Sequence, residues 1–384
     1  MESRLFQSRW SAPQMRALKT SLLVALVMIP SVARSQTSWT GSISSDWFDP
    51  SNWSAGVPTG TLDATIDGGM VSVIAIDTAE AKSLSLGTIG TGSLTLLGSA
   101  DLFTSQDSII AESFGSNGSL NIGGTGTHWL GSEKLTVGKA GTATVNIVSG
   151  GILQSGNPIF GTGAEVAMES TSSVDINVTG LFSRWDIRGG INLGVEGTAE
   201  MTIANGAQVI VTERASSTSK KFGSNAQITV DGDGSLWQLG FVRLGEGGST
   251  HLDIVNGGTV EGFQALMGYE ATGRGQAQVA GEGSKWLVKD LSVGVFGQGQ
   301  LDIIDGGSVG ILGETVISIA PLLGSLGSVR VSGKDSVLTG RSVSVGFDGS
   351  AFLQVESGAL VAVTDGSSRI GPRSGASVVG EGSR

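Results

Sequence analysis

One sequence motif recurs along most of the chain, and this repeat restricts the folds that the chain can adopt. A copy consists of an alternating apolar strand, a glycine-rich turn, a second alternating strand and an ending that reads Gly-x-Gly-Ser-x-Trp before Trp237 and Trp286 and varies in the other copies, which return about every 50 residues. Two landmarks keep phase throughout: Trp129, Trp185, Trp237, Trp286 and Leu338, and, eight or nine residues after each, Gly138, Gly194, Gly245, Gly294 and Gly346. A fixed period of this kind indicates a repeat architecture, with these ten residues as its structural markers.

Each repeat divides into two halves of about 25 residues. In segments such as 252–254 (Leu-Asp-Ile) the apolar residues face one side and the polar residue faces the other. Corners such as Asn256-Gly257 and Asp305-Gly306 supply the positive φ of a sharp turn. No sustained helical period follows the N-terminus. The sequence therefore predicts an all-β fold, a right-handed parallel β-helix (β-solenoid) of about a dozen coils, two per repeat.

Residues 1–35 have the pattern of a signal peptide. Arg4, Arg9, Arg16 and Lys19 precede an apolar run at 22–29, and small residues at 31–35 offer cleavage sites. The run is too short to remain as a membrane anchor. We therefore expect the protein to be exported, to the bacterial cell surface or the extracellular space.

Residues 36–62 form a separate, Trp-rich segment. Trp39, Trp47, Phe48 and Trp53 fall close together and are punctuated by prolines. The rings could form a carbohydrate-stacking platform, or the segment could be an N-terminal cap over the open end of the first coil. The need of a solenoid for such a cover favours the cap.

Residues 63–384 are assigned to the β-helix repeats. The last unit stops at Arg384, the position that Lys285 holds immediately before Trp286. The repeat phase therefore predicts a C-terminally truncated array, with further coils and a surface anchor downstream.

Charge and cysteine content limit the partners. The formal net charge is −11 and the chain has no cysteine. Nucleic acid and anionic membrane surfaces are therefore not expected as partners, and no disulfide framework is available.

We find no pattern of catalytic, cofactor-binding or metal-binding residues. His128 and His251 occupy positions that hold unrelated residues in the other repeats, which is typical of solvated surface sites. No cofactor is therefore expected. The Trp column could be a sugar-binding ladder, but Leu338 replaces one of its members, which favours packing. An enzyme would depend on the long link expected between residues 151 and 174.

The repeat of G-x-L-x-I-x-N-G-G-x-V followed by G-x-G-S-x-W and L-x-V-G resembles those of bacterial autotransporter (type V secretion) passenger domains and PEP-CTERM-associated surface proteins. The opening from Trp39 to Pro58 is similar to the start of many such passengers. The resemblance implies a secreted structural or adhesive stalk, an adhesin at the outer membrane surface without catalysis. It leaves the partner open: a host surface, matrix or polysaccharide. Membrane contact is expected only through an anchor outside these 384 residues. The alternative is a carbohydrate-active β-helix enzyme, a lyase or hydrolase, or a polysaccharide-binding module.

Overall fold

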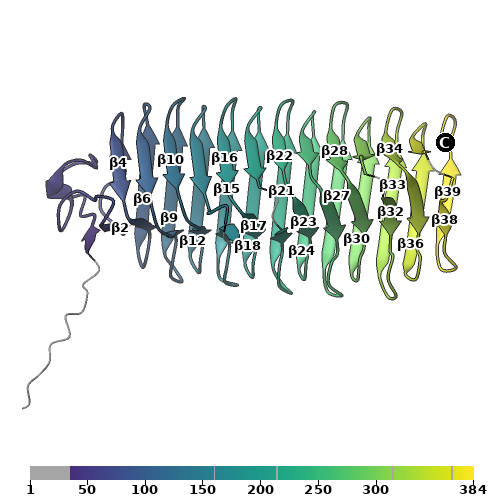
Figure 1. The fold of residues 1–384 in the computed structure, drawn as a ribbon, viewed down its shortest axis with the longest axis horizontal. Helices are drawn as coiled ribbons and strands as arrows, with labels where there is room; N and C mark the ends of the chain where they lie inside the picture. Colours follow the sequence, from purple (N-terminus) through teal and green to yellow (C-terminus); the bar gives the residue numbers. More distant parts are fainter. Residues whose placement is uncertain (1–34, 160, 213–214, 314, 365) are drawn as a thin grey trace, which may run out of the picture. The chain divides into compact units, whose positions relative to one another are not determined.

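The computed structural model describes residues 35–159, 161–212, 215–313, 315–364 and 366–384. The predicted signal peptide lies outside the described residues except for Ser35. From residue 63 onward the chain winds into stacked coils whose strands form three parallel sheets (Figure 1). Among the described residues the one helical element is a 3₁₀ turn, η1 (Pro50–Asn52).

The three sheets run along the stack, and each coil contributes about one strand to each of them. The 14-stranded sheet contains β1 (Gln36–Ser38), β2 (Asp63–Ile66), β5 (Ser83–Leu86), β8 (Ser108–Ile110), β11 (Leu135–Val137), β14 (Thr162–Val166), β17 (Gly190–Leu193), β20 (Ala215–Thr218), β23 (Phe241–Leu244), β26 (Gln264–Met267), β29 (Asp290–Val293), β32 (Val316–Ile319), β35 (Ser342–Val345) and β38 (Arg369–Ile370). The 12-stranded sheet contains β4 (Thr78–Ala81), β7 (Asp101–Thr104), β10 (His128–Gly131), β13 (Ile152–Ser155), β16 (Arg184–Ile187), β19 (Gln208–Val211), β22 (Leu236–Gln238), β25 (Thr259–Glu261), β28 (Lys285–Val288), β31 (Ser308–Ile311), β34 (Val337–Gly340) and β37 (Leu360–Val363). The 13-stranded sheet contains β3 (Ser72–Ile74), β6 (Thr91–Leu97), β9 (Asn117–Gly123), β12 (Thr142–Val148), β15 (Ser173–Thr179), β18 (Thr198–Ala204), β21 (Asn225–Asp231), β24 (Ser249–Val255), β27 (Arg274–Ala280), β30 (Gln298–Ile304), β33 (Leu326–Ser332), β36 (Ser350–Glu356) and β39 (Gly375–Val379).

Within each sheet, successive strands come from successive coils and pair in parallel. Trp129 is in register with Leu153, and Leu153 is in register with Trp185. One coil therefore corresponds to half a repeat, so the tryptophans recur in every second coil. This confirms the predicted β-solenoid with two coils per repeat.

The core lies inside the winding and is built from the inward side chains of the alternating strands. In β24, Leu252 and Ile254 are fully buried, and the equivalent Ile228 and Val230 of β21 pack directly above them in register. Polar residues occupy the outward positions between them. The predicted phase of the alternation is therefore confirmed.

Left-handed backbone makes the corners. Gly194 has a φ of +70°, and a Cβ there would lie 2.8 Å from the carbonyl oxygen of Asn225, so only glycine fits this corner. At the opposite corner, Asn256 and Gly257 have φ values of +52° and +90°. Asparagine tolerates this conformation better than most residues, which explains the Asn-Gly pairs of the repeat.

The segment between residues 151 and 174 differs from the expected long link. It contains β13 and β14, and the extra length of this repeat lies in the corner between Ser155 and Thr162. Expecting a link here was wrong. The strands escaped notice because their inward positions, such as Ser155 and Ala164, are small or polar residues with a weak alternation signal.

The Trp-rich segment lies against the first coil. Trp39, Trp47 and Trp53 are at most 5% exposed, and Trp53 meets the other two rings edge-on at centroid distances of 4.7 and 5.0 Å. The backbone of Trp47 donates a hydrogen bond to Val73 in β3, the first strand of its sheet. With their faces buried, these rings offer no surface for sugar stacking.

Candidate functional site

The outward face of the 13-stranded sheet is built from alternate residues of its strands. Most of its strands have seven residues, and the first, third, fifth and seventh residues of each strand point outward. Asparagines form a ladder at the fifth position: Asn146 donates to Asn121 at 2.8 Å, and Asn177 donates to Asn146 at 3.2 Å. In later coils the same position holds Thr229, Asp253 and other residues, so the surface chemistry changes from coil to coil.

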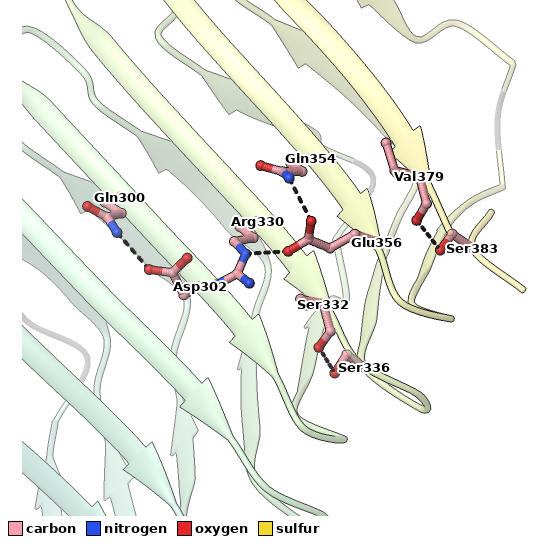
Figure 2. A network of polar contacts seen from close by, with 9 residues as sticks. All are labelled: Gln300, Asp302, Arg330, Ser332, Ser336, Gln354, Glu356, Val379 and Ser383. Atoms are coloured by element: carbon pink, nitrogen blue, oxygen red, sulfur yellow. Dashed lines mark hydrogen bonds and ion pairs between the residues drawn. The ribbon is translucent and has the colours of Figure 1, made fainter. Parts of the chain in front are cut away.

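Toward the C-terminal end this face carries polar contacts that include one ion pair, which Figure 2 shows on β30, β33 and β36. Arg330 donates to Glu356 at 2.7 Å, and Gln354 donates to the other oxygen of the same carboxylate, also at 2.7 Å. The hydrogen bond from Arg330 is the main reason why the pKa of Glu356 lies below its ordinary value. Gln300 donates to Asp302 at 2.7 Å in the same way.

One carboxylate is held by the backbone near the first coils. Burial alone would raise the pKa of Asp67, but the Thr88 hydroxyl and the N–H groups of Gly90 and Ile89 donate hydrogen bonds to it. Together these bonds outweigh the burial, and the pKa lies below its ordinary value. This is a structural role, since it joins one corner to the next.

The repeat-defining tryptophans lie in a single internal column. Trp129, Trp185, Trp237 and Trp286 are at most 1% exposed, and Leu338 continues the column at 0%. The glycines that mark the repeat lie at corners, and their φ values between +65° and +75° are left-handed: Gly138, Gly194, Gly245, Gly294 and Gly346. All ten positions therefore serve the winding of the chain and present no ring or polar group to a ligand.

The indole nitrogens of that column differ in their partners. Trp129 donates to Thr104 at 3.0 Å and Trp185 donates to Ser155 at 3.1 Å. Within the described part of the chain the Nε1 atoms of Trp237 and Trp286 are buried without a partner. Thr104 and Ser155 lie in the preceding coil, opposite the residue two places after the tryptophan. The equivalent residue is Val211 for Trp237 and Gly262 for Trp286, and neither has a hydroxyl.

Val211→Thr should therefore supply the missing acceptor for Trp237. A hydroxyl placed in a core usually costs about 1–3 kcal/mol when it lacks a partner. At residue 211 the new hydrogen bond offsets this cost, so we expect the free energy of unfolding to stay within about 0.5 kcal/mol of the wild type or to rise. Val209→Thr, in the same strand, is the matched control and should lose about 2 kcal/mol. Equal losses in urea denaturation would contradict the assignment.

The serine of the Gly-x-Gly-Ser-x-Trp motif forms hydrogen bonds within its own coil and with the preceding coil. The Ser235 hydroxyl donates to the carbonyl of Asp231 at 2.6 Å and accepts from the N–H of Gly206, one coil earlier, at 3.0 Å. Ser383 repeats the first bond with Val379 and Ser336 repeats it with Ser332 (Figure 2). These serines connect one coil to the one before it, so they are structural.

The two histidines lie on the surface, each next to one carboxylate. His128 contacts Asp101 at 2.7 Å and His251 contacts Asp253 at 3.0 Å. In the described ranges no group of three or more acidic or histidine side chains is placed to hold a metal ion. Over the same residues no helix is long and apolar enough to cross a bilayer.

A groove of about 420 Å³ lies where four long strands begin. We call it the arginine groove. It runs across β27, β30, β33 and β36 and is lined by Arg274, Gly275, Gln276, Gln298, Gly299, Gln300, Leu326, Gly327, Ser328, Ser350, Ala351, Phe352 and Arg373. This groove is not evident from the sequence, because its polar side chains are variable outward residues from coils that only the register brings together. The signal available was the pair Arg274-x-Gln276 and Gln298-x-Gln300 at the same place in consecutive coils.

No family model and no curated protein matches the chain. Among solved structures, it is similar to the TibC-catalysed, hyper-glycosylated fragment of TibA, at 17% sequence identity. The alignment covers 82% of this chain and 98% of that fragment, with a TM-score of 0.30. A likeness at this level supports no conclusion about fold or function, so both rest on the residues and register described above.

Proposed function

We propose that the chain is an exported structural protein, a stalk that displays variable outward side chains at the bacterial surface and adheres through them. The passenger regions of autotransporters, which the repeat resembles, have this role. The observation that carries the proposal is the parallel register, which continues from β2 to β38 in one sheet while the outward residues change from coil to coil. Such a design keeps a constant scaffold beneath an adaptable surface.

We also propose that this segment has no catalytic activity. The enzyme alternative depended on a long link at residues 151–174, and that segment instead contributes the strands β13 and β14 to the solenoid. One of its two carboxylates, Glu165 in β14, is paired with Lys134 at 2.7 Å.

The location can be tested in intact cells of the source bacterium. An antibody against residues 36–384 should label unbroken cells, and external protease should remove the label while a cytoplasmic marker survives. Leu26→Arg, within the apolar run of the signal peptide, should keep the protein inside. Labelling that requires lysis of the wild-type cells would overturn the proposal.

A further inference from the structure

We infer that the arginine groove binds a linear acidic polysaccharide, one whose sugars carry carboxylates. The inference deepens the proposed function, on which it rests, by naming the ligand class and the surface that takes it.

The charge of the groove is opposite to that of the chain. The full sequence has 34 acidic and 23 basic residues, yet Arg274 and Arg373 line the groove and no carboxylate does. Some other arginines of the chain are neutralised by a carboxylate, as Arg184 is by Asp186 at 2.6 Å and Arg330 is by Glu356 at 2.7 Å. Within the described residues neither groove arginine has an ion pair, and both are exposed. A guanidinium presents a planar pair of donors that suits a carboxylate.

The side chains between the two arginines suit sugar hydroxyls. Gln276, Gln298 and Gln300 project from neighbouring strands, and each amide offers both donors and an acceptor. One N–H of Gln300 is used by Asp302, so its carbonyl oxygen remains available to a ligand. Phe352 is 44% exposed and offers an apolar face for the C–H side of a sugar ring.

The spacing of equivalent side chains along the groove matches the spacing of the sugars in a polysaccharide. Its walls are the first and third residues of successive long strands, such as Gln298 and Gln300 in β30 and Arg274 and Gln276 in β27, which are in register. Strands in a sheet are about 4.8 Å apart, so equivalent side chains recur at that spacing. An extended polysaccharide advances by a similar length for each sugar, so that consecutive sugars meet consecutive coils.

The floor of the groove is backbone, and its small residues are required by the fold. A Cβ at Gly299 would lie 2.1 Å from the backbone nitrogen of Gly294, and one at Gly275 would lie 2.5 Å from the carbonyl oxygen of Leu244. The start of each long strand passes close to the preceding corner. Variation at the groove is therefore confined to its walls, where it changes the ligand without changing the coil.

The test measures binding of the purified chain to polygalacturonate by isothermal titration calorimetry at low ionic strength. The wild type should bind this polymer and should bind neither neutral dextran nor single-stranded DNA. Arg274→Gln combined with Arg373→Gln should weaken binding at least about tenfold, the equivalent of one lost charge-assisted contact. The control, Lys220→Gln with Lys221→Gln, removes the same charge outside the groove and should change affinity less than about twofold, because binding depends on position as well as on net charge.

A second pair of variants separates the groove from the fold. Ser328→Glu places a carboxylate in the middle of the groove at an exposed position and should abolish binding, whereas Ser328→Gln should preserve it. Both should keep the wild-type melting temperature. Equal binding by Ser328→Glu, equal loss in the lysine control, or equal binding of DNA or dextran would overturn the inference. The cell-labelling experiment would be unaffected by these outcomes, so the two proposals can fail separately.

Discussion

Replacing Ile254 by aspartate is expected to destabilise the solenoid by more than about 4 kcal/mol, the largest effect of any single substitution considered. Ile254 lies inside the coil and its side chain is 0% exposed to solvent. It is in register with Val230 of the preceding coil and Val279 of the next, so a carboxylate there is surrounded by aliphatic groups. Two effects add: the cavity left by the side chain and the burial of a group without a hydrogen-bond partner.

The matched control is His251→Ala in the same strand. The His251 side chain is 43% exposed and contacts only Asp253 among the charged groups described. An exposed pair of this kind contributes little, so the free energy of unfolding should change by about 0.5 kcal/mol or less. Urea denaturation of both variants gives the comparison. Losses of similar size would mean that the two faces of β24 have been exchanged.

Ser235→Ala is also expected to have a large effect, a loss of about 2 kcal/mol in the free energy of unfolding. The substitution leaves the N–H of Gly206 and the carbonyl of Asp231 without the partner that they now share. Ser235 is fully buried, so water does not replace the hydroxyl. Because Gly206 belongs to the preceding coil, hydrogen exchange at its amide should also accelerate.

Two controls separate the serine's hydrogen bonds from its size. Thr127 occupies the same place in an earlier coil and accepts from the N–H of Ser99 at 3.0 Å, so Ser235→Thr should retain most of the stability. Ser249→Ala removes a hydroxyl that has no side-chain hydrogen bond among the described residues and should cost less than about 0.5 kcal/mol. If Ser235→Ala proved as mild as Ser249→Ala, the hydroxyl would not connect the coils.

The fold could be predicted because its constraints recur in the sequence. Trp185 and Gly194 mark two different points of one coil, and their common period of about 50 residues leaves few architectures. The inward positions of β24 or β21 alternate strictly, so the strand phase could also be inferred. In β13 and β14 the inward residues include Ser155 and Ala164, and there the pattern was too weak to show a coil.

The side-chain contacts between coils could not be predicted from the sequence. The hydroxyl of Thr104 meets the indole of Trp129, although 25 residues separate them, and nothing local distinguishes Thr104 from an outward threonine. Arg274 and Arg373 come together at one groove only through the exact stacking of coils. The repeat predicts that side chains recur in columns, but the chemistry of a column depends on residues that vary.

The central claim is that one coil follows another in register every half repeat, and a cysteine cross-link tests it directly. The chain has no cysteine of its own, so any disulfide comes from introduced residues. Thr202 and Thr229 are register partners on adjacent strands, about 4.8 Å apart, within the range that a disulfide spans.

Thr202 and Asp253 are two coils apart, at about twice that distance and beyond disulfide reach. Thr202→Cys with Thr229→Cys should therefore oxidise to an intramolecular disulfide, detected by mass spectrometry. Thr202→Cys with Asp253→Cys should remain reduced under the same conditions. A reduced first pair, or a disulfide in the second, would contradict the stacking of the coils.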